Sequence, residues 1–170
     1  MTQRLREHPD ELDVLVGITA ETLGMPAAYV EKDFWVTEVL RASSIARSVT
    51  MPDGTAEPVT FTFKGGTSLS RVFGIVQRFS EDVDLLAEFP IGASMGERHK
   101  VLRAVDRDIR AHLDFEGDRV IMGPSTTGVK RYTTYMYGAA NASEDLKEGV
   151  LLELGSRGGA DPSSVHHFVR

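Results

Sequence analysis

Two carboxylates separated by one apolar residue stand in the segment Asp82-Val83-Asp84. Successive side chains of a β-strand point to opposite faces, so a strand here places Asp82 and Asp84 on one face and Val83 on the other. Paired carboxylates on one face are typical ligands of Mg²⁺, whose coordination shell is usually completed by substrate phosphates. The pair therefore predicts a site for Mg²⁺ or Mn²⁺. The alternative is a solvated strand end or turn, where the same spacing also occurs.

A second acidic pair with the same spacing, Asp106 and Asp108, provides an internal comparison. It lies in residues 97–113, a segment whose apolar residues recur with the period of an amphipathic helix. At about 100° per residue, two side chains two positions apart on a helix point in nearly opposite directions. Only Asp82 and Asp84 are therefore expected to converge on one site.

A glycine-rich turn follows the alternating β-branched and aromatic run 59–63, which predicts a strand. Its two glycines permit positive φ and close approach of a ligand to the backbone. The hydroxyl residues after them can cap a helix, and the free N–H groups at a helix start bind phosphate well. The alternative is an ordinary strand-to-helix turn. The residues of this predicted phosphate site are Lys64, Gly65, Gly66, Thr67 and Ser68.

The composition is that of an ordinary globular domain. The chain has 170 residues, no cysteine and a formal net charge of −6. The absence of cysteine excludes disulfides and thiolate metal sites and is compatible with the cytoplasm. No apolar run approaches membrane length, so no membrane partner is expected. The net negative charge argues against non-specific coating of nucleic acid, although a local basic patch is compatible with it.

Residues 63–71, followed by residues 78–85, resemble the nucleotidyltransferase signature of AbiEii-like toxins. These toxins belong to the polymerase-β-type nucleotidyltransferase superfamily, in which a helix-opening Gly-Gly or Gly-Ser precedes Asp-hydrophobic-Asp. Residues 30–40 also resemble the N-terminal helix of that family. The resemblance implies a toxin of a toxin–antitoxin or abortive-infection pair. Some members, the MenT-type enzymes, add nucleotides to the 3′ acceptor end of tRNA and so block translation.

The resemblance implies an α/β (α+β) fold, with a polymerase-β-type nucleotidyltransferase core, a mixed sheet and an N-terminal helical cap. We expect one domain over residues 1–170, with the cap at about 8–46 and the catalytic core at about 57–170. Superfamily sites usually need a third carboxylate on a neighbouring strand. Glu153, in the otherwise apolar strand 149–154, is the candidate, and an outward-facing acid is the alternative. Ser80 precedes the acidic strand and is a further candidate contact to triphosphate.

The implied reaction transfers NMP from an NTP to a hydroxyl, with Asp82, Asp84 and Lys64 as catalytic residues. Two Mg²⁺ or Mn²⁺ ions would be held by the two aspartates and Glu153. The implied partners are the NTP, a tRNA or other RNA acceptor and a cognate antitoxin, all in the cytoplasm. Two alternatives stay open. The first is a non-catalytic fragment or degenerate domain that binds NTP or antitoxin, and the second is transfer to a protein hydroxyl.

Two departures from the family pattern bear on activity. The spacer between Gly66 and Asp82 is longer than is usual in the superfamily. Family members also carry a later helical motif with a lysine and an Arg-Asp…Asp element, and the 170 residues contain no such element. We therefore expect the C-terminal helical part of the family to be absent. We further expect these residues alone to fold but to transfer nucleotides poorly.

Overall fold

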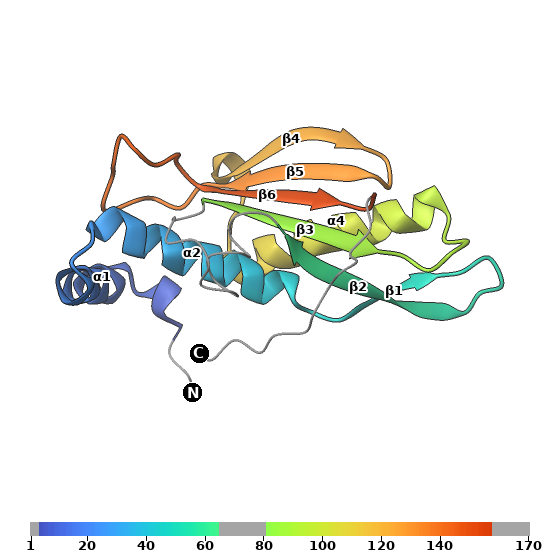
Figure 1. The fold of residues 1–170 in the computed structure, drawn as a ribbon, viewed down its shortest axis with the longest axis horizontal. Coiled ribbons are helices and arrows are strands. Elements are labelled where there is room, and N and C mark those ends of the chain that lie inside the picture. Colours follow the sequence, from blue (N-terminus) through green and yellow to red (C-terminus); the bar gives the residue numbers. More distant parts are fainter. Residues whose placement is uncertain (1–3, 65–80, 158–170) are drawn as a thin grey trace.

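The computed structural model describes residues 4–64 and 81–157, which form three α-helices and one six-stranded sheet (Figure 1). The helices are α1 (Pro9–Leu23), α2 (Ala27–Ser43) and α4 (Met95–Leu113), with 3₁₀ turns at Leu5–Glu7 and Gly117–Arg119. The strands are β1 (Arg47–Thr50), β2 (Ala56–Lys64), β3 (Asp82–Glu88), β4 (Val120–Thr126), β5 (Lys130–Tyr135) and β6 (Val150–Gly155). None of the helices in these described residues has the length and apolar character needed to span a membrane.

The strands follow the order β1-β2-β3-β6-β5-β4 across the sheet. β3 and β6 pair in parallel, and every other neighbouring pair is antiparallel. The sheet is therefore mixed, and the expected α+β fold is confirmed. The chain between β3 and β6 passes through α4 and the β4–β5 hairpin, so the two central strands are neighbours in space although they are distant in sequence.

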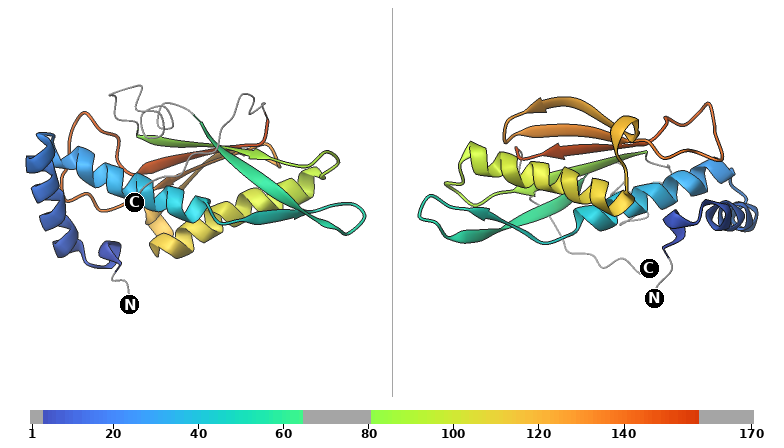
Figure 2. Two further views of the ribbon diagram at one scale, coloured as in Figure 1. Left: turned by 60° about the horizontal axis from the view of Figure 1, so that its bottom comes forward. Right: turned by 180° about the vertical axis from the view of Figure 1, so that it is seen from behind.

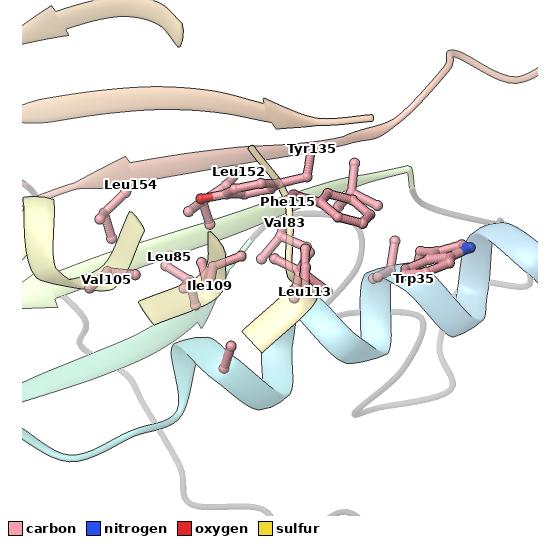
Figure 3. Close-up of a cluster of buried hydrophobic side chains, with 14 of the residues drawn as sticks. Trp35, Val83, Leu85, Val105, Ile109, Leu113, Phe115, Tyr135, Leu152 and Leu154 are labelled. Atoms are coloured by element: carbon pink, nitrogen blue, oxygen red, sulfur yellow. The ribbon is translucent and has the colours of Figure 1, made fainter. Parts of the chain in front are cut away.

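Helices α2 and α4 cover the same face of the sheet (Figure 2), and α1 packs against α2. The sheet presents alternate residues of its central strands to these helices, as the close-up of the core shows (Figure 3). Val83 of β3 and Leu152 of β6 are almost fully buried there, beside Val105 and Ile109 of α4. Trp35 of α2 joins the same core, and its ring stacks on Tyr137 with centroids 5.4 Å apart. On the opposite face the central strands carry Asp82, Asp84 and Glu153 together with Leu86 and Leu151.

The helix boundaries follow from local sequence. Gly24 ends α1 in the left-handed conformation with φ of 64°, a conformation that suits glycine. Ser94 caps α4 by accepting a hydrogen bond from the backbone N–H of Glu97. The predicted helix at 97–113 and the predicted strands at 59–63 and 149–154 are present. β1 and β4 were not predicted.

The acidic pair on α4 diverges, as the helical spacing predicts. Asp106 is buried, accepts a hydrogen bond from the Tyr135 hydroxyl at 2.8 Å, and pairs with Arg131 at 3.0 Å and Arg110 at 2.9 Å. Asp108 instead pairs with Arg47 at 3.0 Å. Arg131 of β5 and Arg47 of β1 therefore join the two acids of α4 to the sheet, and neither acid is directed toward the other.

Candidate active site

The two aspartates of β3 lie on the sheet face that α2 and α4 leave open. The intervening Val83 is fully buried against the helices, and Leu85 is 6 % exposed on the same side. Strand alternation then directs Asp82 and Asp84 to the other face, where both are half-buried. The apolar positions of β3 anchor the strand in the core, and this anchoring fixes the direction of both carboxylates.

A row of polar residues crosses four strands at the level of Asp84. In the sheet register Asp84 pairs with Lys64 of β2 on one side and with Glu153 of β6 on the other. Glu153 in turn pairs with Tyr132 of β5. Residues directly opposite one another on neighbouring strands share a face and lie about 5 Å apart. Lys64, Glu153 and Tyr132 therefore flank Asp84 on the open face.

The carboxylates of this row repel one another. Burial raises the pKa of the Asp84 carboxyl above its usual range, and Asp82 raises that pKa further, against the opposing effect of Lys64. Burial also raises the pKa of Glu153, followed by the effects of Asp84 and Asp82, while Lys130 and Lys147 act in the opposite direction. The carboxyl groups of β3 and β6 therefore repel one another when ionised, and a bound cation would offset this repulsion.

An open pocket of about 170 Å³ lies over these residues. Its charged and polar lining comes from β2, β3, β5, β6 and the segment after β6, namely Lys64, Asp84, Lys130, Tyr132, Glu153 and Arg157. Two carboxylates and three basic side chains therefore share one small concave surface. This combination suits a ligand that carries both a metal ion and phosphate groups.

A buried lysine holds the start of both acidic strands. Lys32 of α2 is 1 % exposed, and its Nζ donates hydrogen bonds to the carbonyl oxygens of Lys147, at 2.7 Å, and of Gly149. The same Nζ lies 3.7 Å from Oε2 of Glu81, which also accepts the Lys147 backbone N–H at 2.7 Å. Burial lowers the pKa of Lys32, against the effects of Glu81 and Asp82. Lys32 therefore joins the residue before β3 to the residues before β6.

The carboxylates of the site suit a divalent cation whose coordination shell is completed by the substrate. Within residues 4–64 and 81–157, no group of three or more His, Asp or Glu side chains is gathered into a metal-binding cluster. Mg²⁺ is commonly bound through one or two carboxylates, with substrate phosphates and water filling the remaining positions. Asp82 and Asp84, with Glu153 on the adjacent strand, match that mode of binding better than an all-protein cage.

The sequence-predicted residues divide into two groups. The structure brings Lys64, Asp82, Asp84 and Glu153 together on one face of the sheet. The other predicted phosphate contacts lie outside the described residues; they are Gly65, Gly66, Thr67, Ser68 and Ser80.

The structure also adds residues that sequence reasoning missed. Tyr132 and Lys130 lie on β5 facing the acids, and Lys32 lies beneath the strand starts. The alternation of residues 128–138 could have placed Tyr132 on one face of a strand, but not opposite Glu153, because register depends on tertiary packing. A lysine within a helix ordinarily reads as a surface residue, so the sequence contained no clear signal for Lys32.

Comparison with known proteins places the chain in a family. No curated protein and no solved structure matches it. One family model does match, over residues 55–169, and its description is "Nucleotidyl transferase AbiEii toxin, Type IV TA system". The match spans well over half of the chain and contains β2, β3 and β6, the strands that carry the row of carboxylates. The chain therefore belongs to the AbiEii family of nucleotidyltransferase toxins of type IV toxin–antitoxin systems.

Proposed function

We propose that this chain transfers NMP from an NTP to the 3′ end of tRNA and thereby blocks translation. The observation that carries the proposal is the register of β2, β3 and β6, which aligns Lys64, Asp84 and Glu153 on the open face beside Asp82. The family supports a nucleotidyltransferase toxin with an NTP substrate and a cognate antitoxin. The tRNA acceptor, the choice of Mg²⁺ and a cytoplasmic location are parts of the proposal.

Asp82, Asp84 and Glu153 are the residues that would hold Mg²⁺ or Mn²⁺. When bound, such ions neutralise charge on the transferring phosphate and orient the attacking and leaving oxygens. The raised pKa values of Asp84 and Glu153 support this role, because carboxylates that repel one another gain most from a shared cation. Burial of Val83 on the other side of β3 keeps the aspartates in place without rearrangement when the substrate binds.

Lys64 and the glycine-rich segment after it would bind the phosphates of the NTP. Lys64 is exposed at the end of β2 and lies opposite Asp84, so its ammonium group is available to a phosphate beside the acids. On sequence grounds we propose that the backbone of Gly65 and Gly66 and the hydroxyl groups of Thr67, Ser68 and Ser80 complete the phosphate site. Positioning and charge neutralisation supply most of the catalysis in phosphoryl and nucleotidyl transfers.

In the proposed reaction a hydroxyl oxygen of the acceptor forms a new bond to the α-phosphorus. The bond from that phosphorus to the oxygen bridging the α- and β-phosphates breaks, and pyrophosphate leaves. The hydroxyl proton passes to solvent. Lys32 holds Glu81 and the residues before β6 together, and we propose that it keeps Asp82 and Glu153 aligned during this exchange.

We propose that the cap at about 8–46 and the catalytic core at about 57–170 function as one domain. Residues of both segments share one apolar core, in which Trp35 of α2 packs beside Phe115 and Tyr137. In addition, Lys32 and Glu31 of α2 bind the backbone of residues that precede β6. The cap therefore supports the site directly.

The proposal is tested by incubating the protein with each radiolabelled NTP, Mg²⁺ and total tRNA. The wild type should transfer label to tRNA with at least one NTP, and Asp84→Asn should reduce the rate by about 10² or more, the usual loss for one preorganised electrostatic contact. Glu57→Gln is the control, because Glu57 is an exposed acid on β2 away from the row. Transfer of the label to a protein instead of tRNA would show that tRNA is not the acceptor. NTP binding with no transfer to any acceptor would favour a non-catalytic binding domain.

A further inference from the structure

A second and larger pocket lies at the end of the sheet, and Ile121 of β4 brings one side of it onto the face that carries the acids. Its volume is about 490 Å³, within the range of roughly 300–1,000 Å³ that is typical of small-molecule sites. It is formed by Ala28 of α2, the 3₁₀ turn before β4, Ile121 of β4 and the connection from residue 136 to residue 148. Ile121, Met136 and Leu146 contribute apolar surface, and Tyr137 contributes an aromatic edge.

The sheet register connects this pocket to the acidic site. Ile121 of β4 pairs with Thr134 of β5, Thr134 pairs with Leu151 of β6, and Leu151 pairs with Asp82 of β3. These four residues therefore share one face in a continuous row. With neighbouring strands about 4.8 Å apart, Ile121 lies roughly 14 Å from Asp82 across the open face. Ile121, at the rim of the pocket, and the acids therefore lie along one face of the sheet.

The wall of the pocket is fixed to the frame of the site. Glu31 of α2 is buried and accepts hydrogen bonds from the backbone N–H groups of Ala140, at 3.0 Å, and Asn141, at 2.9 Å. Lys147, farther along the same wall, is bonded to Glu81 and Lys32 next to β3. The connection is thus tied to α2 at both of its ends, and the pocket is a built feature of the fold.

The charges of the pocket indicate what it can hold. Its ionisable lining residues are Asp118, Arg119, Lys147 and Glu148, two acids and two bases, so their formal charges cancel. A balanced pocket with an apolar floor does not attract a phosphate. It suits an uncharged planar group with polar edges, such as a nucleobase. The basic residues Lys130 and Arg157 lie nearer the acids, where a backbone phosphate would pass.

The geometry of in-line displacement indicates whether such a base would belong to the NTP or to the acceptor RNA. Lys64 places the phosphates of the NTP, and hence the leaving pyrophosphate, on the β2 side of Asp84. The attacking hydroxyl must approach from the opposite side, which is the side of β6 and β5. A strand that presents its terminal hydroxyl there continues over Leu151 and Thr134 toward Ile121.

We propose that the pocket between Ile121 of β4 and residues 136–148 receives a base of the acceptor RNA close to its 3′ end. This inference rests on the proposed function and adds to it a specific acceptor subsite. Tyr132, which faces the acids from β5, lies beside the route of the strand and offers a ring on which a base can stack.

The chain offers a matched pair of variants to test this subsite. Ile121 and Met122 are neighbours on β4 with similar exposure, 52 % and 47 %, but they face opposite sides of the sheet. Ile121→Glu and Met122→Glu therefore introduce the same charge, one within the pocket and one outside it. The probe is a short fluorescent single-stranded RNA ending in CCA, whose affinity is measured by anisotropy. Affinity for NTP with Mn²⁺ is measured separately by calorimetry.

Ile121→Glu should weaken RNA binding about tenfold, the loss expected for one displaced base, while Met122→Glu should leave it within about twofold. NTP affinity should be unchanged in both proteins. In the wild type, RNA carrying 4-thiouridine near its 3′ end should form a photo-crosslink within residues 136–148, a result that requires no variant. Crosslinks confined to other segments would contradict the assignment.

Three other outcomes would overturn the inference. Equal weakening by both variants would show a general effect of charge, and weaker NTP binding in Ile121→Glu would assign the pocket to the base of the donor. A wild type that binds no RNA would remove the acceptor subsite altogether. Nucleotide transfer would still be tested in that case, because transfer from NTP to a different acceptor does not require RNA binding. Loss of that transfer in Asp84→Asn would still support the catalytic site.

Discussion

Replacing Asp84 by asparagine should stabilise the protein in the absence of metal and destabilise it, relative to wild type, once Mn²⁺ is added. The pKa of Asp84 is raised first by burial and then by Asp82, and the pKa of Glu153 is raised by burial and by both aspartates. The folded state therefore brings together carboxyl groups whose negative charges repel one another. Asparagine keeps the shape of the side chain and removes one of these charges.

The size of the gain follows from Coulomb's law. Asp84 and Glu153 are direct neighbours on adjacent strands, about 5 Å apart. At that separation two unit charges repel by roughly 3 kcal/mol at an effective dielectric of about 20 and by roughly 0.8 kcal/mol in water. Both side chains are half-buried and screened by solvent, so the free energy of unfolding of Asp84→Asn should rise by about 1 kcal/mol.

The pH dependence has a definite sign. A carboxyl group whose pKa is raised by folding binds more protons in the folded state than in the unfolded state. Its contribution to stability is present below the ordinary carboxyl pKa and is lost as the pH rises through the raised value. Wild-type stability should therefore fall as the pH rises from about 4 through the raised pKa values of Asp84 and Glu153. Asp84→Asn should show a smaller fall.

Urea denaturation at pH 7, with EDTA or with Mn²⁺, measures both effects. Trp35 is the only tryptophan and is buried beside Phe115 and Tyr137, so its fluorescence reports on the core. Mn²⁺ at about 100 times its Kd should stabilise the wild type by about 2.7 kcal/mol and the variant by much less. Glu57→Gln should behave as wild type in both conditions. A variant that is less stable in EDTA, or that gains as much from Mn²⁺ as the wild type, would refute the reasoning.

Three further predictions concern the elements around the acids. Lys32→Met should lower the free energy of unfolding, measured by urea denaturation, by about 3 kcal/mol, because it leaves Glu81 and two carbonyl groups without their buried partner. The control, Lys100→Met on the exposed face of α4, should change the free energy of unfolding little. Mn²⁺ affinity, measured by calorimetry, should fall as the pH drops below the raised pKa values of Asp84 and Glu153, by about tenfold per pH unit for each proton that the metal displaces. A Mn²⁺ affinity that does not change with pH would exclude the two residues as ligands. Gly66→Val should abolish NTP binding in calorimetry and Arg103→Ala should not, because a branched side chain blocks close backbone approach; unchanged affinity in a folded Gly66→Val protein would show that the segment is only a turn.

The strands that carry the acids could be predicted because their patterns are local. The alternation of acidic and apolar residues in β3 and the β-branched and aromatic run in β2 each identify a strand and its two faces. The strand period of two also distinguishes Asp82 and Asp84 from the divergent pair on α4. Alternation is a property of neighbouring residues, so it needs no knowledge of the tertiary structure.

The missing strands lack such a pattern. β1 has only four residues and follows α2 after a short turn. β4 contains Gly123 and Pro124, and its pairing with β5 shifts between Met122 and Ser125. Glycine and proline are typical of turns, and within sheets proline is confined to edges and bulges. β4 is an edge strand of the sheet, which is where such a sequence can be accommodated.

Non-local relations could not be predicted from the sequence. Asp84 and Glu153 become neighbours because α4 and the β4–β5 hairpin return the chain to the edge of β3, and the register of that parallel pair depends on core packing. Lys32 is buried because the residues before β6 fold over it and supply carbonyl acceptors. Nothing within several residues of Lys32 distinguishes it from a solvated lysine.

The central claim is that Asp82 and Asp84 bind the metal ion that serves nucleotide transfer. The most direct test is a Mn²⁺ titration of the full chain, followed by electron paramagnetic resonance, with and without a non-hydrolysable NTP. The wild type should bind Mn²⁺ more tightly when the NTP is present, because phosphates complete the shell. Asp82→Ala/Asp84→Ala should lose this tightest binding while remaining folded. Equal Mn²⁺ affinity in the wild type and the double variant would contradict the account.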